Sequence, residues 1–99
     1  MFWFSKEPLT REDVISLIQK NYNSREYLFL RGRNLEGIDL SGLDLYTVTL
    51  NGAMLRNANL SRAKLVGIDL SHADLTGANL TGAEFCGSCL TNADLLRSL

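Results

Sequence analysis

Two groups of side chains in this sequence have types and spacings that could support chemistry. Cys86 and Cys89 form a C-x-x-C motif, which is the spacing of thioredoxin-type dithiols and of half a zinc site. Ser71, His72 and Asp74 lie close together in the chain and are the three residue types of a hydrolytic triad. The sequence around each group decides whether such chemistry is expected.

The surrounding sequence does not supply what either chemistry requires. A redox C-x-x-C motif needs a helix start in a βαβ unit, a zinc site usually takes four ligands, and a triad needs a pocket with an oxyanion hole. His72 is the only histidine. We therefore interpret Cys86 and Cys89 as free thiols and His72 as an exposed structural residue. We predict no enzyme activity, no cofactor and no metal site, and keep a redox or metal role of the cysteine pair as an alternative.

Length and charge limit the possible partners. A chain of 99 residues is expected to form one domain, and its eleven acidic and ten basic residues give a net charge of −1. Nucleic-acid binding normally requires a basic patch, and none is visible. No apolar run approaches the length of a membrane span, and the apolar residues 1–4 are too few for a signal peptide. We expect a cytoplasmic protein with reduced cysteines and without nucleic-acid or membrane partners. The role of Phe2, Trp3 and Phe4 stays open.

A five-residue repeat organises the chain from Leu30 onward. Every fifth residue is apolar, and the residue two positions earlier is small or aliphatic, apart from Arg33 and Ser88. All eight glycines lie two residues after an apolar centre. The apolar centres are Leu30, Leu35, Leu40, Leu45, Leu50, Leu55, Leu60, Leu65, Leu70, Leu75, Leu80, Phe85, Leu90 and Leu95.

A period of five residues fits neither a helix nor a plain strand. It is explained if the chain turns a corner every five residues, so that each side buries one large and one small residue. Glycine then occupies corners that need a positive φ. Four corners make a coil of twenty residues, and residues 30–97 give roughly 3.4 coils at β-ladder spacing. The prediction is an all-β solenoid.

Stacking of these coils would place residues twenty apart directly above one another. The register predicts a charged ladder of Asp44, Lys64 and Glu84, and a pair of Glu36 with Arg56. It also predicts a polar ladder of Asp39, Asn59 and Asn79, a serine and threonine ladder of Ser41, Ser61 and Thr81, and an outward apolar stripe of Tyr46, Val66 and Cys86.

Units such as 73–77 (ADLTG) and 78–82 (ANLTG) resemble the pattern A-[DN]-L-x-x of the pentapeptide-repeat family. The resemblance covers about residues 30–97 and implies the right-handed quadrilateral β-helix of that family. Arg33 departs from the small inward position, and Met54, Lys64 and Cys89 replace the usual Asp or Asn. The first coil has bulkier inward residues than the later ones, which indicates a wider and less regular coil.

Residues 1–29 form a separate N-terminal segment before the β-helix of residues 30–99. A helix is predicted over about residues 9–21, because Thr10 and Asp13 resemble a capping box and Val14, Leu17 and Ile18 share one face. We expect this helix to cap the leucine stack of the first coil, since terminal repeats need a cover. A partner-binding helix is the alternative.

The repeat runs through residues 93–95 and the sequence stops at Leu99, with no second capping pattern after it. An open apolar edge invites association. We therefore expect a homodimer, or another chain that continues the solenoid through this coil. The candidate interaction surface combines this edge with the outward apolar stripe and consists of Tyr46, Val66, Cys86, Leu90, Leu95, Leu96 and Leu99.

These observations favour a non-catalytic structural or protein-interaction module whose partner the sequence does not identify. The family resemblance implies an alternative, a DNA-mimicking protein that binds DNA gyrase and either inhibits it or protects it from quinolones. A DNA mimic needs strong, distributed negative charge to imitate phosphates. The net charge of −1 argues against that alternative.

Overall fold

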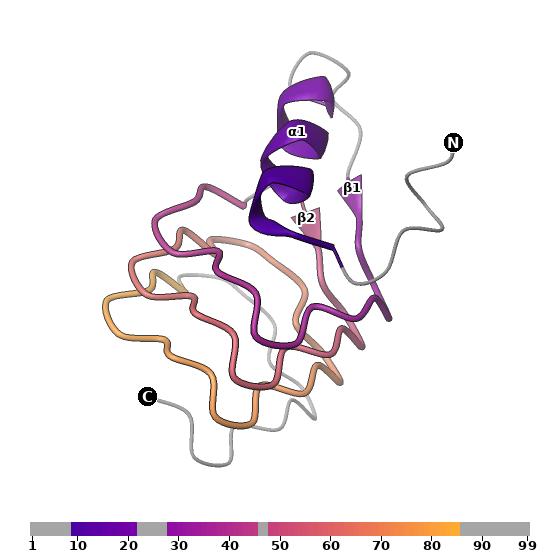
Figure 1. Ribbon diagram of the computed structural model, residues 1–99. Coiled ribbons are helices and arrows are strands. Elements are labelled where there is room, and N and C mark those ends of the chain that lie inside the picture. Colours follow the sequence, from indigo (N-terminus) through magenta and orange to yellow (C-terminus); the bar gives the residue numbers. More distant parts are fainter. Residues whose placement is uncertain (1–8, 22–27, 46–47, 86–99) are drawn as a thin grey trace.

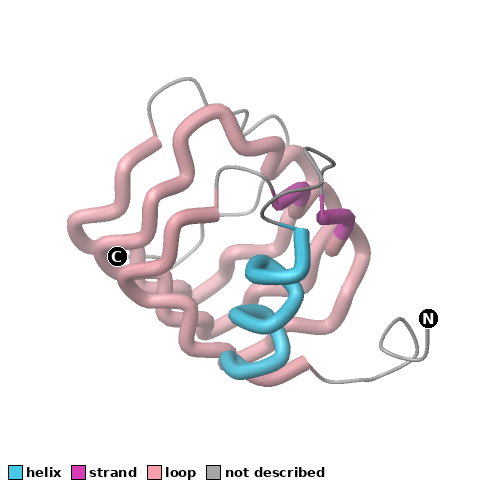
Figure 2. The backbone as a smooth tube through the Cα atoms, turned by 90° about the horizontal axis from the view of Figure 1, so that it is seen from above, coloured by secondary structure: helices cyan, strands magenta, loops and turns pink. Residues whose placement is uncertain are grey.

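The computed structural model describes residues 9–21, 28–45 and 48–85 (Figure 1). Helix α1 spans Arg11–Asn21, and two short strands, β1 (Leu28–Phe29) and β2 (Val48–Thr49), pair in parallel. The rest of the described chain winds in stacked coils, with α1 lying beyond the first of them (Figure 1). Viewed from above, the coils follow one another around a common axis (Figure 2).

Parallel bridges join the coils between residues that are twenty apart in the sequence. Phe29 pairs with Thr49 through β1 and β2, and isolated bridges join residues 34, 39 and 44 to residues 54, 59 and 64. Residues 54, 59 and 64 are bridged in turn to residues 74, 79 and 84. A bridge therefore recurs on each five-residue side, which confirms the twenty-residue register and the predicted ladders of Asp44 and Asp39.

Leucine side chains fill the interior of the coils. The central leucines from Leu30 to Leu75 are all 0–1% exposed, and most of the smaller residues two positions earlier are buried beside them. Full burial of a leucine stabilises a fold by about 1.5–3 kcal/mol, so this column is the main source of stability. Leu43, Leu80, Ala83 and Phe85 are only partly buried against it.

Each corner whose residues are all described is a hydrogen-bonded turn with a positive φ at its third residue. At one corner the amide of Ala58 donates to the carbonyl of Leu55 at 3.0 Å. Glycine fills most of the described corners, as predicted, because a Cβ is disfavoured in this left-handed region. Asn57, Arg62 and His72 adopt the same conformation with φ between 59° and 61°, so the fold tolerates a side chain there.

Helix α1 begins one residue after its N-cap. The amide of Thr10 donates to Asp13 Oδ2 at 2.9 Å, and the amide of Asp13 donates to Thr10 Oγ1 at 3.2 Å. This reciprocal pair is the capping box that the sequence predicted. The helix therefore starts at Arg11 rather than at Leu9, because Thr10 must stay outside the helix to cap it.

The apolar face of α1 belongs to the same buried cluster as the coil leucines. Val14 and Leu17 are buried in it, as is Leu9, and Ile18 is partly buried against it. Leu9 and Val14 occupy the positions of a hydrophobic staple on either side of the N-cap. The helix is thus tied to the coils by apolar packing at its first turns.

Replacing a corner glycine by alanine is expected to lower the free energy of unfolding by different amounts at two corners. Gly67→Ala should destabilise the protein by about 1–2 kcal/mol through its left-handed φ alone, because a Cβ there would meet no atom within 4 Å. Gly77→Ala should cost more, since its Cβ would collide with the side chain of Asn57. Urea unfolding measures both free energies.

An Asn57→Gly background removes the side chain with which the new Cβ would collide, so that the cost of the left-handed φ at residue 77 can be measured alone. There, Gly77→Ala should cost no more than Gly67→Ala costs in the natural sequence. Equal costs for the two alanine substitutions in the natural sequence would contradict this account of the corners.

Candidate interaction surfaces

In the part of the chain that the structure describes, the candidate functional groups are outward side chains. Across residues 9–20, 30–45 and 48–85, where burial is described, every buried side chain is apolar. No titratable or nucleophilic group within these ranges is therefore held inside the coils. The polar outward positions and the edge of the first coil remain as candidates.

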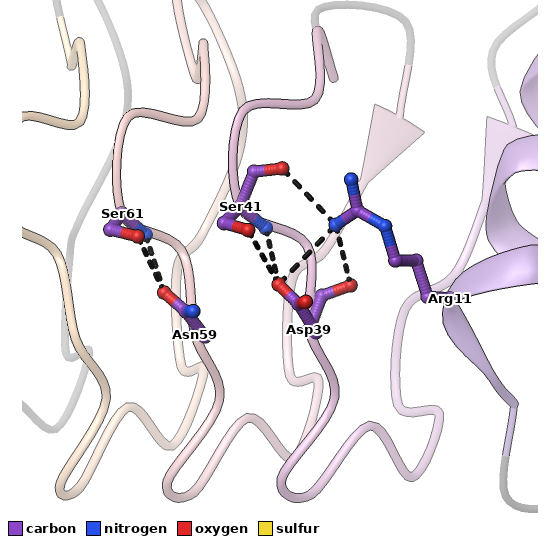
Figure 3. Close-up of polar contacts among 5 residues, drawn as sticks. All are labelled: Arg11, Asp39, Ser41, Asn59 and Ser61. Carbon is purple, nitrogen blue, oxygen red and sulfur yellow. Dashed lines mark hydrogen bonds and ion pairs between the residues drawn. The ribbon is translucent and has the colours of Figure 1, made fainter.

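A repeated polar pair lines the outer surface just before and just after the buried leucines. Asp39 Oδ1 accepts from both the amide and the hydroxyl of Ser41, at 3.0 and 2.6 Å. Asn59 makes the same two bonds with Ser61 one coil later (Figure 3). The pairs Asp69–Ser71 and Asp74–Thr76 repeat the arrangement on two later sides.

These pairs lower the pKa of three aspartates. Donation by the neighbouring hydroxyl is the main cause at Asp39, Asp69 and Asp74, and the bond from the backbone amide adds to it. Each carboxylate is thereby kept ionised as the acceptor of its own turn. The arrangement stabilises corners and supplies no base poised for proton transfer near neutral pH.

The three residues of the possible triad do not act together. Ser71 donates its hydroxyl to Asp69 at 2.6 Å, and Asp74 accepts instead from Thr76. His72 is exposed at a corner with a φ of 61°. A triad needs the histidine to accept the serine proton, so this geometry offers no activated nucleophile.

Only one residue of the predicted interaction surface lies in the described part of the chain. Val66 points outward and is 44% exposed. The other six members (Tyr46, Cys86, Leu90, Leu95, Leu96 and Leu99) lie outside the described residues, as do Cys89, Phe2, Trp3 and Phe4. Self-association through the last coil therefore stays a prediction.

Met54 is a second exposed apolar residue, which the sequence reasoning did not place on a surface. It is 44% exposed and sits in a ladder between Asn34 and Asp74. The sequence does carry a signal for this exposed residue, since Met54 replaces the Asp or Asn that is usual at this position of the repeat. Beside it, Arg56 pairs with Asp74 at 3.6 Å, where stacking had suggested Glu36 as its partner. Exposed Met next to Arg is a composition enriched at protein interfaces.

Arg11 of α1 covers part of the edge of the first coil. Its Nη1 donates to the carbonyls of Asp39 and Ser41, each at 3.1 Å, and contacts Asp39 Oδ1 at 3.3 Å (Figure 3). The equivalent carbonyls one coil later, those of Asn59 and Ser61, accept from the amides of Leu40 and Gly42 at 2.8 and 3.0 Å. The guanidinium thus occupies the place of a preceding coil.

Coils stacked in register, with buried leucines and polar corner pairs, define a repeat protein. The chain belongs to the pentapeptide repeat family: the family model for pentapeptide repeats matches residues 30–62 and 55–92, with 8 copies. No curated protein sequence gives a significant match. Within the described residues, α1 has neither the length nor the hydropathy of a membrane-spanning helix.

Two solved structures place the fold among β-helix-like proteins. The chain is similar to the pentapeptide repeat protein Rfr23 of the cyanobacterium Cyanothece 51142, with 31% identity and a TM-score of 0.61 over 71% of this chain. It spans only 54% of that protein. It is also similar to a pentapeptide repeat protein of Nostoc PCC 7120, with 30% identity and a TM-score of 0.52, over 94% of this chain and 78% of the other.

The lowered aspartate pKa values predict a dependence of stability on pH. A carboxyl whose pKa is lower in the folded chain stabilises the fold above its unfolded value of 3.8 and loses that contribution as the pH falls through and below it. The urea midpoint should therefore fall as the pH is lowered from about 5 through 3.8 and below it.

Replacing Asp39, Asp69 and Asp74 together by Asn should reduce that fall, because Asn59 shows that an amide oxygen accepts the same bonds. The variant should stay folded at neutral pH. An acid-induced drop as large as that of the natural sequence would contradict this role of the carboxylates.

Proposed function

We propose that this chain is a non-catalytic protein-interaction module. In this proposal it is a right-handed quadrilateral β-helix with α1 as its N-terminal cap, and the outer sides of the coils bind a protein partner. The observation that carries the proposal is the exposure of Met54 and Val66, each 44%. The other large apolar side chains whose burial the structure describes are buried or partly buried.

The interior supports a structural rather than a catalytic role. The coil leucines are buried, and the carboxylates Asp39, Asp69 and Asp74 are occupied as acceptors within their own corners. A substrate site is normally a concave pocket with a few convergent polar groups. A repeat solenoid instead presents flat, regular surfaces to its partners.

The two exposed apolar residues are on different sides of the coil. Met54 stands in the ladder of Asn34 and Asp74, and Val66 lies beside the ladder of Asp44, Lys64 and Glu84. Each has polar and charged neighbours, which is the anatomy of an apolar interface centre with a polar rim. We propose that the partner contacts one or both of these sides.

Two substitutions test which side binds. Met54→Glu and Val66→Glu should each leave folding intact, because Glu84 occupies the position equivalent to Met54, and Glu36 that equivalent to Val66. The tagged natural chain and both variants are used to capture proteins from a lysate of the source organism. A partner that binds through these sides should be lost, by about tenfold or more, from at least one variant.

Asn51→Glu provides the matched control, because it adds the same charge at an outward position on another side of the coil. It should retain the partner. Capture of the same proteins in the same amounts by all four forms would contradict the proposal that the Met54 and Val66 sides bind.

A further inference from the structure

The edge of the first coil holds two backbone acceptors that are filled by a side chain rather than by another strand. The carbonyls of Asp39 and Ser41 both accept from Arg11 Nη1. One coil later the same two carbonyls, of Asn59 and Ser61, accept from backbone amides two residues apart in the coil above. The pattern recurs in the next coil, where Asn79 and Thr81 accept from Leu60 and Arg62, both at 2.8 Å.

The acceptors of the first coil are therefore already arranged for an extended strand. A row of backbone groups that no neighbouring strand pairs with is a template for pairing with another chain. Two donors from residues i and i+2 of such a strand would reproduce the bonds made by Leu40 and Gly42. A single guanidinium nitrogen satisfies both carbonyls at present.

We propose that this edge is a binding site for an extended strand of a partner polypeptide, and that Arg11 is an autoinhibitory contact that keeps it closed. When Arg11 withdraws, the carbonyls of Asp39 and Ser41 accept from two backbone amides of the incoming strand. The proposal goes beyond the module function above, because it concerns the edge of the coil and not its outer sides.

Charge defines the strand that fits. Asp39 immediately precedes the donor Leu40. In the ladder it stacks on Asn59, which immediately precedes the equivalent donor of the next coil. A strand on the open edge would place the residue before its first donor against the carboxylate of Asp39. Arg11 now supplies a positive charge there, at 3.3 Å from Asp39 Oδ1. The edge therefore favours a strand with Lys or Arg immediately before its first donor.

The chain itself contains a segment with this chemistry. In the unit 63–67 (AKLVG), Lys64 precedes Leu65, and the amides of Leu65 and Gly67 correspond to those of Leu40 and Gly42. In its own ladder, the backbone of Lys64 is bridged to two acidic residues, Asp44 and Glu84. A synthetic peptide with the sequence of residues 61–70 is therefore a suitable probe.

The experiment titrates this peptide into the full chain and into its Arg11→Gln and Arg11→Met variants, and follows binding by NMR shifts of the Asp39 and Ser41 signals. Both variants should bind it at least about tenfold more tightly than the natural chain, because both lack the guanidinium that occupies the two carbonyls. The same peptide carrying N-methyl groups at Leu65 and Gly67 cannot donate these bonds, and should not bind.

Three results would overturn the proposal. The first is equal binding by the natural chain and both variants, and the second is binding of the N-methylated peptide as tight as that of the unmodified one. The third is loss of folding in both Arg11 variants by circular dichroism, since Arg11 would then be an obligate part of the fold and not a removable contact. None of these results would affect the test at Met54 and Val66.

Discussion

The hydrogen bonding of backbone groups between coils is the constraint on which the rest of the structure depends. A carbonyl that faces a neighbouring coil must find a donor, because an unpaired backbone group is costly. This requirement sets the twenty-residue register seen from Asp39 to Asn59 to Asn79. It also explains why the carbonyls of Asp39 and Ser41, which accept from no backbone amide among the described residues, take a donor from the Arg11 side chain.

The register places chemically different residues on different surfaces without changing the interior. Leucine at each centre and a smaller residue before it satisfy the core, so the outward positions are free to vary. Asp and Asn beside Ser and Thr close the corners, and Met54 and Val66 interrupt this polar pattern. Under the function proposed above, departures from the repeat carry recognition, while the repeat itself carries stability.

The period of the sequence predicted the coil and the inward leucines, because both depend on strict repetition. The spacing of Thr10 and Asp13 predicted the capping box, because it depends on neighbours within a few residues. Side-chain contacts on the surface could not be predicted in this way. The contact of Arg11 with Asp39 joins residues 28 apart and depends on how the helix lies on the coil, which periodicity does not specify. The pair of Arg56 and Asp74 likewise crosses between neighbouring rows, where simple stacking had favoured Glu36.

The central claim is that residues twenty apart are neighbours in adjacent coils, and engineered disulfides test it most directly. In a Cys86→Ser and Cys89→Ser background, the pair Ser61→Cys with Thr81→Cys should form a disulfide under mild oxidation, because ladder neighbours are about 4.8 Å apart and a disulfide spans 4.4–6.8 Å between Cα atoms. The pair Ser61→Cys with Thr76→Cys, fifteen residues apart on different sides, should not. Efficient cross-linking of the second pair in place of the first would contradict the twenty-residue coil.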